Sequence, residues 1–195
     1  YPFKELSGCG VGFKLVEAYS VKNNFPKEEL LTFLDLVVVS NAADIVPITG
    51  ENRVLAHYGI DLVNKQPRPG IEAILETGNV RRTNRSHQDY VFSKELSISD
   101  LVFMIGPRIN AAGRIESAKN SVRLLIEENY ADAFEIAKKI NLLNDERKSL
   151  DLTATGDALR MIKESDELRD ANYTVVYDPD WHKGVIGIVA SRLTE

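Results

Sequence analysis

ADAFEIAKKINLLNDERKSLDLTATGDALRMIKES, residues 131–165, is a long stretch without proline and with one glycine, Gly156. Apolar residues recur in it in steps of three and four, the spacing of one face of a helix. These residues are Ile136, Ile140, Leu143, Leu150, Ala154, Ala158 and Met161. At 1.5 Å per residue the helix is about 50 Å long. The pattern therefore predicts one long, continuous helix.

Arg147 interrupts the apolar face of this predicted helix, and Asn144 lies beside it, one turn earlier. A charged residue on an apolar face is costly unless a carboxylate or a phosphate neutralises it. Two explanations remain open on the residues alone. Arg147 forms an internal ion pair with Asp145 or Asp151, or it contacts a phosphate group.

Apolar spacing predicts further helices before the long one. One of them begins after Gly10-Val-Gly12, and the others cover residues 26–34, 51–64 and 71–75. The run Leu36-Val-Val-Val39 fits either a strand or a buried helix end. Near the other end, Tyr173-Thr-Val-Val-Tyr177 predicts a buried strand, because β-branched and aromatic residues fill it.

Composition limits the possible functions. The 195 residues are 44% hydrophobic, which is enough for a core, and no apolar run approaches the roughly 18 residues of a membrane span. The single cysteine, Cys9, excludes an internal disulfide and fits a reducing, cytoplasmic compartment. A net charge of −5 argues against coating nucleic acid by bulk electrostatics. The positive cluster Arg81, Arg82 and Arg85 lies in a turn-rich stretch and predicts a solvated loop.

The segment MIGPRINAAGR, residues 104–114, combines breakers with side chains that grip anions. Its proline and its second glycine predict a turn. Arg108, Asn110 and Arg114 offer donors suited to phosphate oxygens. The alternative is a tight helix-helix connection whose arginines pair with neighbouring carboxylates.

The segment DPDWHKGVIGIVASR, residues 178–192, follows the predicted strand. A turn of the form Trp-His-x-Gly that opens a small-residue helix leaves free N–H groups, which favour anions. Asp178 and Asp180 resemble a pair of metal ligands, but the proline between them favours a turn that ends the strand.

PRINAAGR and WHKGVIGIVASR resemble motifs of the RecJ family of single-strand-specific DNA exonucleases, in the DHH phosphoesterase superfamily. Upstream, LSGCGVGFKL (residues 6–15) resembles the segment that follows the family's Asp-His-His motif. Ala43-Asp-Ile-Val-Pro47 with Gly50-Glu-Asn-Arg53 resembles its fourth catalytic motif, although relatives often carry Gly-Thr-Val where this chain has Ser40-Asn-Ala42. These matches follow the family's order along nearly the whole chain.

The resemblance implies an α/β fold that is helix-rich in this part. Residues 1–66 are expected to be the C-terminal part of a DHH domain, and residues 67–168 a helical connector that contains the long interdomain helix. Residues 169–195 are expected to start an α/β DHHA1 domain. Both ends look cut, so we expect an internal fragment.

The resemblance also implies site residues. Asp44 is expected to be catalytic and to bind Mn²⁺ or Mg²⁺, which prefer carboxylate oxygens. The residues expected to bind DNA phosphates are Arg108, Asn110, Arg114, Asn144, Arg147 and His182. In the family the other metal ligands lie in motifs upstream of Tyr1. One carboxylate cannot hold two metal ions, so these 195 residues alone are expected to be inactive.

The implied function is hydrolysis of single-stranded DNA from the 5′ end by two divalent ions about 3.5–4 Å apart, in repair and recombination. Single-stranded DNA is the expected partner, with a single-strand-binding protein and a helicase beside it, and no membrane. Two alternatives stay open: a DHH-family nanoRNase or cyclic-dinucleotide phosphodiesterase, and a non-catalytic RecJ-like replication scaffold.

Overall fold

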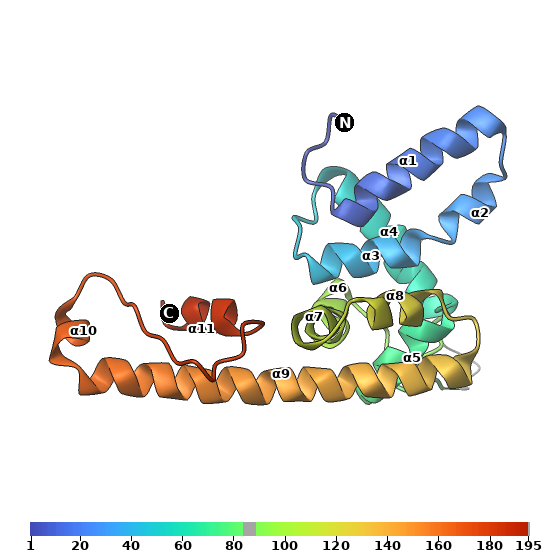
Figure 1. The fold of residues 1–195 in the computed structure, drawn as a ribbon. Coiled ribbons are helices and arrows are strands. Elements are labelled where there is room, and N and C mark those ends of the chain that lie inside the picture. Colours follow the sequence, from blue (N-terminus) through green and yellow to red (C-terminus); the bar gives the residue numbers. More distant parts are fainter. Residues whose placement is uncertain (84–88, 195) are drawn as a thin grey trace.

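The computed structural model describes residues 1–83 and 89–194, and its regular structure there is almost entirely helical (Figure 1). The helices are α1 (Gly8–Asn23), α2 (Lys27–Leu31), α3 (Leu34–Ala43), α4 (Gly50–Lys65), α5 (Pro69–Thr77), α6 (Ile98–Met104), α7 (Gly106–Ile115), α8 (Lys119–Ile126), α9 (Tyr130–Glu164), α10 (Asp166–Asp170) and α11 (Ile186–Arg192). The β structure in these ranges is one isolated antiparallel bridge, between Arg82 and Phe92. The prediction of a helix-rich structure is confirmed. The described part contains no β-sheet, so it does not show the sheet that an α/β fold requires.

Helix α9 confirms the long helix predicted from the sequence. It has 35 residues and begins after Asn129, whose side chain accepts a hydrogen bond from the backbone N–H of Asp132 at 3.1 Å. Small side chains dominate its buried face, which consists of Ala133, Ala137, Ile140, Asn144, Asp151, Ala154 and Ala158. Leu143 and Leu150 lie at the edge of that face and are half-buried. The small side chains let other helices approach α9 closely.

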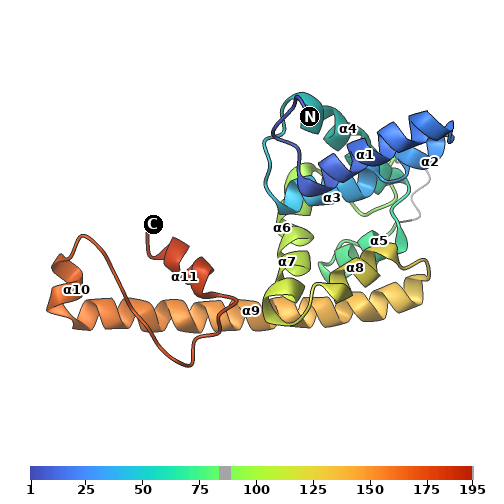
Figure 2. The ribbon, with the colours of Figure 1, turned by 45° about the horizontal axis from the view of Figure 1, so that its top comes forward.

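Two groups of elements pack on α9 at different positions along its length (Figures 1 and 2). Helices α5, α7 and α8 pack on its first half, where Ala133, Ala137 and Ile140 belong to the main core. Helices α10 and α11 pack on its second half, where Ala154 and Ala158 form a separate small cluster with Val189. None of the described helices has the length and apolar composition that crossing a lipid bilayer requires.

The main core joins elements from both sides of residue 66. Val38 of α3 and Val63 of α4 share it with Ile71 of α5 and Ile140 of α9, and all four are fully buried. Helix α3 also packs against α6 and α7. The division into domains at residues 66 and 168 remains a prediction, but helices α3 to α9 pack around one core.

A buried ion pair fixes the junction of α2, α3, α5 and α8. Arg68 donates from Nε and Nη2 to the carboxylate of Asp35, whose side chain is 3% exposed. Its remaining donors reach the carbonyl oxygens of Leu125 and Thr32, each at 3.2 Å. A two-pronged bond between guanidinium and carboxylate holds both groups in one orientation. Arg68 therefore ties three chain segments to the start of α5.

Several predicted boundaries differ from the observed ones in the first half of the chain. The helix predicted over residues 26–34 is split, because α2 ends at Leu31 and α3 begins at Leu34. The run Leu36-Val-Val-Val39, which fitted a strand or a helix equally, lies inside α3. The predicted helices over residues 51–64 and 71–75 correspond to α4 and to a longer α5.

The prediction of a turn in PRINAAGR is wrong, because these residues form helix α7. Pro107 lies in its first turn, where the missing N–H costs no helical hydrogen bond. Gly113 lies within the helix, and the Cβ of an alanine there would meet only the Ala118 side chain, at 3.7 Å. Ala111 and Ala112 are fully buried. The small residues thus serve helix packing, which the prediction of a turn overlooked.

The prediction of a buried strand at residues 173–177 is also wrong. The segment is extended but has no ladder partner among the described residues, and Tyr173, Val175 and Tyr177 are each about three-quarters exposed. Val176 alone turns inward, toward the cluster formed by Ala154 and its neighbours. Residues of high β-propensity form a stable strand only when a second strand pairs with them.

Close helix packing gives a direct test of this fold. At Gly70 an added Cβ would lie 1.9 Å from the carbonyl oxygen of Leu124 on α8, whereas at Gly156 it would meet nothing within 4 Å. Gly70→Ala should therefore lower the free energy of unfolding by at least about 1–3 kcal/mol in urea denaturation. The matched control Gly156→Ala should raise it by up to about 1 kcal/mol. Equal stability of the two variants would contradict the packing of α5 on α8.

Candidate phosphate-binding site

A pocket of about 170 Å³ lies where the end of α3, helix α7, helix α9 and the start of α11 meet. Its lining consists of Ala42, Ala43, Ile45, Val102, Gly106, Pro107, Asn110, Arg114, Arg147 and Ile188. Three of the predicted phosphate-binding residues, Asn110, Arg114 and Arg147, are among them. The lining has two guanidinium groups and one amide but no carboxylate. A pocket of this composition favours an anion.

Helix α7 places two of these side chains on the same face, because Asn110 and Arg114 are four residues apart. Asn110 Nδ2 donates to the carbonyl oxygen of Ala43 at 3.5 Å. Arg114 Nη1 donates to the carbonyl oxygen of Gly184 at 3.3 Å. Helix α7 therefore connects the end of α3 with the turn before α11. Both hydrogen bonds are long, and each side chain has further donors for a ligand.

The turn before α11 fits against α7 because residue 184 is glycine. A Cβ at Gly184 would lie 2.3 Å from the carbonyl oxygen of Arg114. The Gly184 N–H donates to Nδ1 of His182 at 3.1 Å, which closes the turn from within. His182 is half-buried and is not part of the pocket lining. Its predicted contact with nucleic acid remains untested, and its observed role is to shape the turn.

Arg147 lacks the internal ion pair that was one explanation for its position. Its Nη2 donates to Oδ1 of Asn144 at 3.1 Å, and its buried Nε has no hydrogen-bond partner within the described ranges. Asp145 pairs instead with Lys148 at 3.1 Å, and Asp151 with Arg192 at 3.0 Å. Asn144 is 1% exposed and orients the guanidinium. The structure thus removes one of the two explanations, and contact with a phosphate remains a prediction.

Asp44 caps the end of α3, and both of its chain neighbours line the pocket. Its side chain is exposed, and Oδ2 accepts a hydrogen bond from Ser40 Oγ at 3.3 Å. The chain turns sharply after it, since Ile45 has a φ of 52°. No ion pair engages this carboxylate in residues 1–83 and 89–194, so it suits a hard cation such as Mn²⁺.

One carboxylate is not a complete metal site. The part of the chain that the structure describes contains no group of three histidine, cysteine, aspartate or glutamate side chains that could hold an ion. Asp178 and Asp180 do not form such a group, and the Asp180 N–H donates to Oδ1 of Asp178 at 2.8 Å in a tight turn. This agrees with the prediction of a turn there. Asp44 fits a metal site only as one ligand among others.

Arg108 lies away from the pocket. Its Nε donates to Asn141 Oδ1 at 2.9 Å and its Nη1 to the carbonyl oxygen of Met104 at 2.7 Å. Burial lowers the pKa of this guanidinium, and the charge of Asp145 partly opposes that shift. Its role in binding DNA remains untested, while its observed contacts fix α7 to α9.

Pocket-lining residues such as Gly106 and Ile188 were not expected from the sequence. A Cβ at Gly106 would lie 3.3 Å from Cα of Ala43, so the glycine lets α7 approach the end of α3. The signal for Gly106 was present in MIGPRINAAGR as small residues beside arginines. Of the cluster predicted as a solvated loop, Arg82 pairs with Glu72 at 2.8 Å, Arg81 is exposed, and Arg85 lies outside the described residues.

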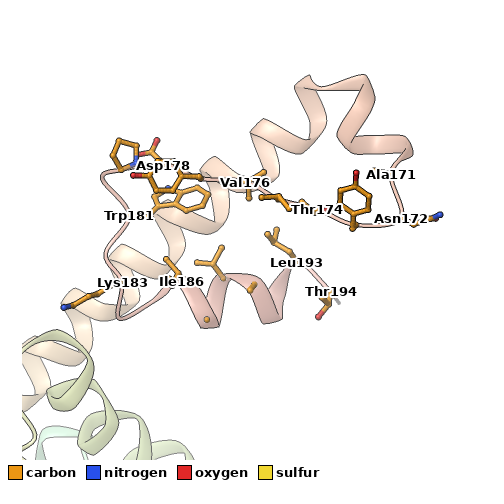
Figure 3. A pocket seen from close by; sticks show the side chains of 17 residues that line it. Ala171, Asn172, Thr174, Val176, Asp178, Trp181, Lys183, Ile186, Leu193 and Thr194 are labelled. Atoms are coloured by element: carbon orange, nitrogen blue, oxygen red, sulfur yellow. The ribbon is translucent and has the colours of Figure 1, made fainter.

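A second, larger groove of about 910 Å³ lies between residues 171–178 and α11 (Figure 3). Mostly apolar side chains line it, among them Val176, Trp181, Ile186 and Leu193. Trp181 is half-buried and packs against the cluster of Ala154, Ala158 and Val189, which anchors the turn to α9. This groove lacks arginine in its lining and does not resemble a phosphate site.

Comparison with known proteins gives consistent matches, although no family model matches the chain. It is 34% identical over its whole length to the single-stranded-DNA-specific exonuclease RecJ of Escherichia coli (strain K12) and to that of Bacillus subtilis (strain 168). It is 30% identical over 97% of its length to RecJ of Thermus thermophilus. The chain spans 34%, 22% and 25% of the lengths of these relatives.

Two solved structures agree. A crystal structure of exonuclease RecJ bound to manganese matches with a TM-score of 0.79 and 29% identity, over 98% of this chain and 45% of the other. RecJ of Thermus thermophilus in complex with Mg²⁺ matches with a TM-score of 0.79 and 30% identity, over 98% of this chain and 28% of the other. Along its whole length, the chain is therefore a homologue of one part of the RecJ single-stranded-DNA-specific exonucleases.

Proposed function

We propose that this chain is the part of a RecJ-like, metal-dependent exonuclease that holds the phosphates of single-stranded DNA beside the metal centre. The observation that carries the proposal is the pocket lined by Arg114, Arg147 and Asn110, which has no carboxylate in its lining and flanks Asp44. The whole protein would hydrolyse single-stranded DNA from its 5′ end. The named activity of the matching relatives supports this proposal.

The pocket suits a backbone phosphate better than a base. Its lining offers guanidinium and amide donors, while tyrosine, tryptophan and phenylalanine, on which bases stack, are absent from it. Arginine forks match the geometry of phosphate oxygens. The protein does not fully engage the guanidinium of Arg147, because its buried Nε has no acceptor in the described ranges. Binding of this kind is independent of sequence, as an exonuclease requires.

Asp44 would act as one ligand of Mn²⁺ or Mg²⁺, the ions named with the matching structures. When bound, such ions activate water and stabilise the leaving oxygen. The remaining ligands would come from outside these 195 residues. Asp44 itself contributes a carboxylate that is exposed and anchored at the end of α3. Its position one residue from the pocket would put the metal centre beside the bound phosphate.

The wider assignments belong to the same proposal. Residues 1–66 would complete a DHH domain, residues 67–168 the connector, and residues 169–195 the start of a DHHA1 domain. The parent protein would act in repair and recombination in the cytoplasm, beside a single-strand-binding protein and a helicase. Figure 1 shows α9 running beneath the first group of helices and on toward α10 and α11, which agrees with a connector.

Asp44→Ala in the full-length protein should abolish Mn²⁺-dependent hydrolysis of labelled single-stranded DNA, because it removes a metal ligand. Its melting temperature should stay near that of the wild type, because Asp44 is exposed and makes no ion pair in the described part of the chain. Asp61→Ala is the matched control, since Asp61 is also exposed and, among the described residues, pairs only with Lys65, at 2.7 Å. Wild-type turnover by Asp44→Ala would show that this residue is not a ligand.

Arg147→Ala should weaken binding of single-stranded DNA and flatten its salt dependence. The slope of log affinity against log salt should change by about 0.7, the value for one lost phosphate contact on a single strand. Thermal stability should change little, because Arg147 makes no ion pair in the described structure. Arg160→Ala, which removes an exposed arginine of the same helix, is the control. A lower melting temperature with an unchanged slope would assign Arg147 a structural role instead.

A further inference from the structure

Helix α11 depends on α9 for its position. It has seven residues, too few for a helix to be stable alone in water. Val185 and Val189 are buried, and Val189 packs against Ala154 and Ala158 of α9. Ile188, one residue before Val189, lines the phosphate pocket. The placement of α11 on α9 therefore determines where one wall of the pocket lies.

In the part of the chain that the structure describes, one ion pair neutralises the buried carboxylate of Asp151 under α11. Arg192 Nη2 lies 3.0 Å from Asp151 Oδ2, and the two side chains are 42% and 2% exposed. The other oxygen of Asp151, Oδ1, is buried and has no hydrogen-bond partner in the described ranges. A buried carboxylate without a cation is strongly unfavourable, so Asp151 needs a positive partner.

Two cations of α9 lie within reach of Asp151, Arg147 and Lys148, and Lys148 is already paired with Asp145 at 3.1 Å. Arg147 precedes Asp151 by four residues, a spacing at which charged side chains on a helix meet. In the structure Arg147 donates to Asn144 instead, and its buried Nε has no hydrogen-bond partner in the described ranges. While Asp151 pairs with Arg192, Arg147 makes no ion pair with it.

We propose that Arg192 is a positioning residue: by neutralising Asp151 it keeps Arg147 free to bind a DNA phosphate. Without Arg192, Asp151 captures Arg147 and draws its guanidinium out of the pocket. The same ion pair holds the end of α11, while the Arg114 hydrogen bond to Gly184 holds the turn before it. The proposal rests on the proposed function, because it assigns the pocket to phosphate.

The first test uses the full-length protein and single-stranded DNA at several salt concentrations. Arg192→Gln should weaken binding about as much as Arg147→Ala and flatten the salt slope by about 0.7, as for one lost phosphate contact. The second-site change Asp151→Asn in the Arg192→Gln background should restore the slope, because the carboxylate that captures Arg147 is gone. Arg160→Gln, which breaks an exposed pair with Asp157 on α9, should bind like the wild type.

Two other outcomes would overturn the proposal. A slope that stays flat in the double variant would mean that Arg192 itself contacts DNA. An unchanged slope with a lower melting temperature would mean that the Asp151 pair serves stability alone. Arg192→Lys should retain most of the binding, since a lysine can still neutralise Asp151.

A second measurement needs no DNA and separates this proposal from the proposed function. A double-mutant cycle of Arg147→Ala and Asp151→Asn is followed by thermal unfolding, once in the wild-type background and once with Arg192→Gln. The coupling between the two residues should be near zero in the first background and clearly stabilising in the second. Absence of coupling in the second would overturn the proposal even if the enzyme degrades DNA. If the coupling appears but the protein does not bind DNA, the capture of Arg147 by Asp151 still holds. In that case the proposed function is refuted instead.

Discussion

The close approach of other helices to α9 is the constraint on which the rest of this structure depends. Ala133 and Ala137 lie under the first group of helices, and Ala154 and Ala158 lie under α11. Away from α9, glycines allow the same close packing. Gly70 touches the backbone of α8, and Gly184 touches the backbone of α7. Larger side chains at these positions would push the packed elements apart, and at Gly184 they would separate the turn before α11 from α7, which lines the candidate pocket.

The charges follow from that packing. Between Asn144 and Asp151 the buried face of α9 turns from apolar to polar, at the level where α7 and α11 meet it. Two carboxylates near Arg147 have a cation of their own, Lys148 for Asp145 and Arg192 for Asp151. Arg147 is left with an amide partner, and the pocket lining carries no negative charge. Positive charge is thus concentrated beside Asp44, where an anionic substrate and a metal ion would meet.

Local sequence patterns were sufficient to predict part of the fold and of the candidate site. The steps of three and four in residues 131–165 predicted α9, and the misplaced charge on its face drew attention to Arg147. Resemblance supplied the link between PRINAAGR, WHKGVIGIVASR and Asp44, and the structure brings the first two into contact through Arg114 and Gly184. The matches to RecJ, which extend along nearly all of this chain, confirm the resemblance itself.

Other features could not be predicted, because they depend on partners far away in the sequence. The proline and glycine of α7 suggested a turn, since the packing of Ala111 and Ala112 is invisible in one segment. Residues 173–177 have strand propensity but no strand beside them in the described ranges. Arg108 resembled the other arginines of its motif, yet its contacts with Asn141 direct it to α9. The choice of Arg192 as partner of Asp151 likewise joins residues on two helices.

The central claim is that Arg114, Arg147 and Asn110 hold one phosphate of single-stranded DNA beside Asp44. A crystal structure of the full-length protein with a short single-stranded oligonucleotide tests it most directly. We expect a backbone phosphate in this pocket, with an oxygen about 2.7–3.0 Å from a guanidinium nitrogen of Arg147. A strand that passes elsewhere, with Arg147 still bonded only to Asn144, would contradict it.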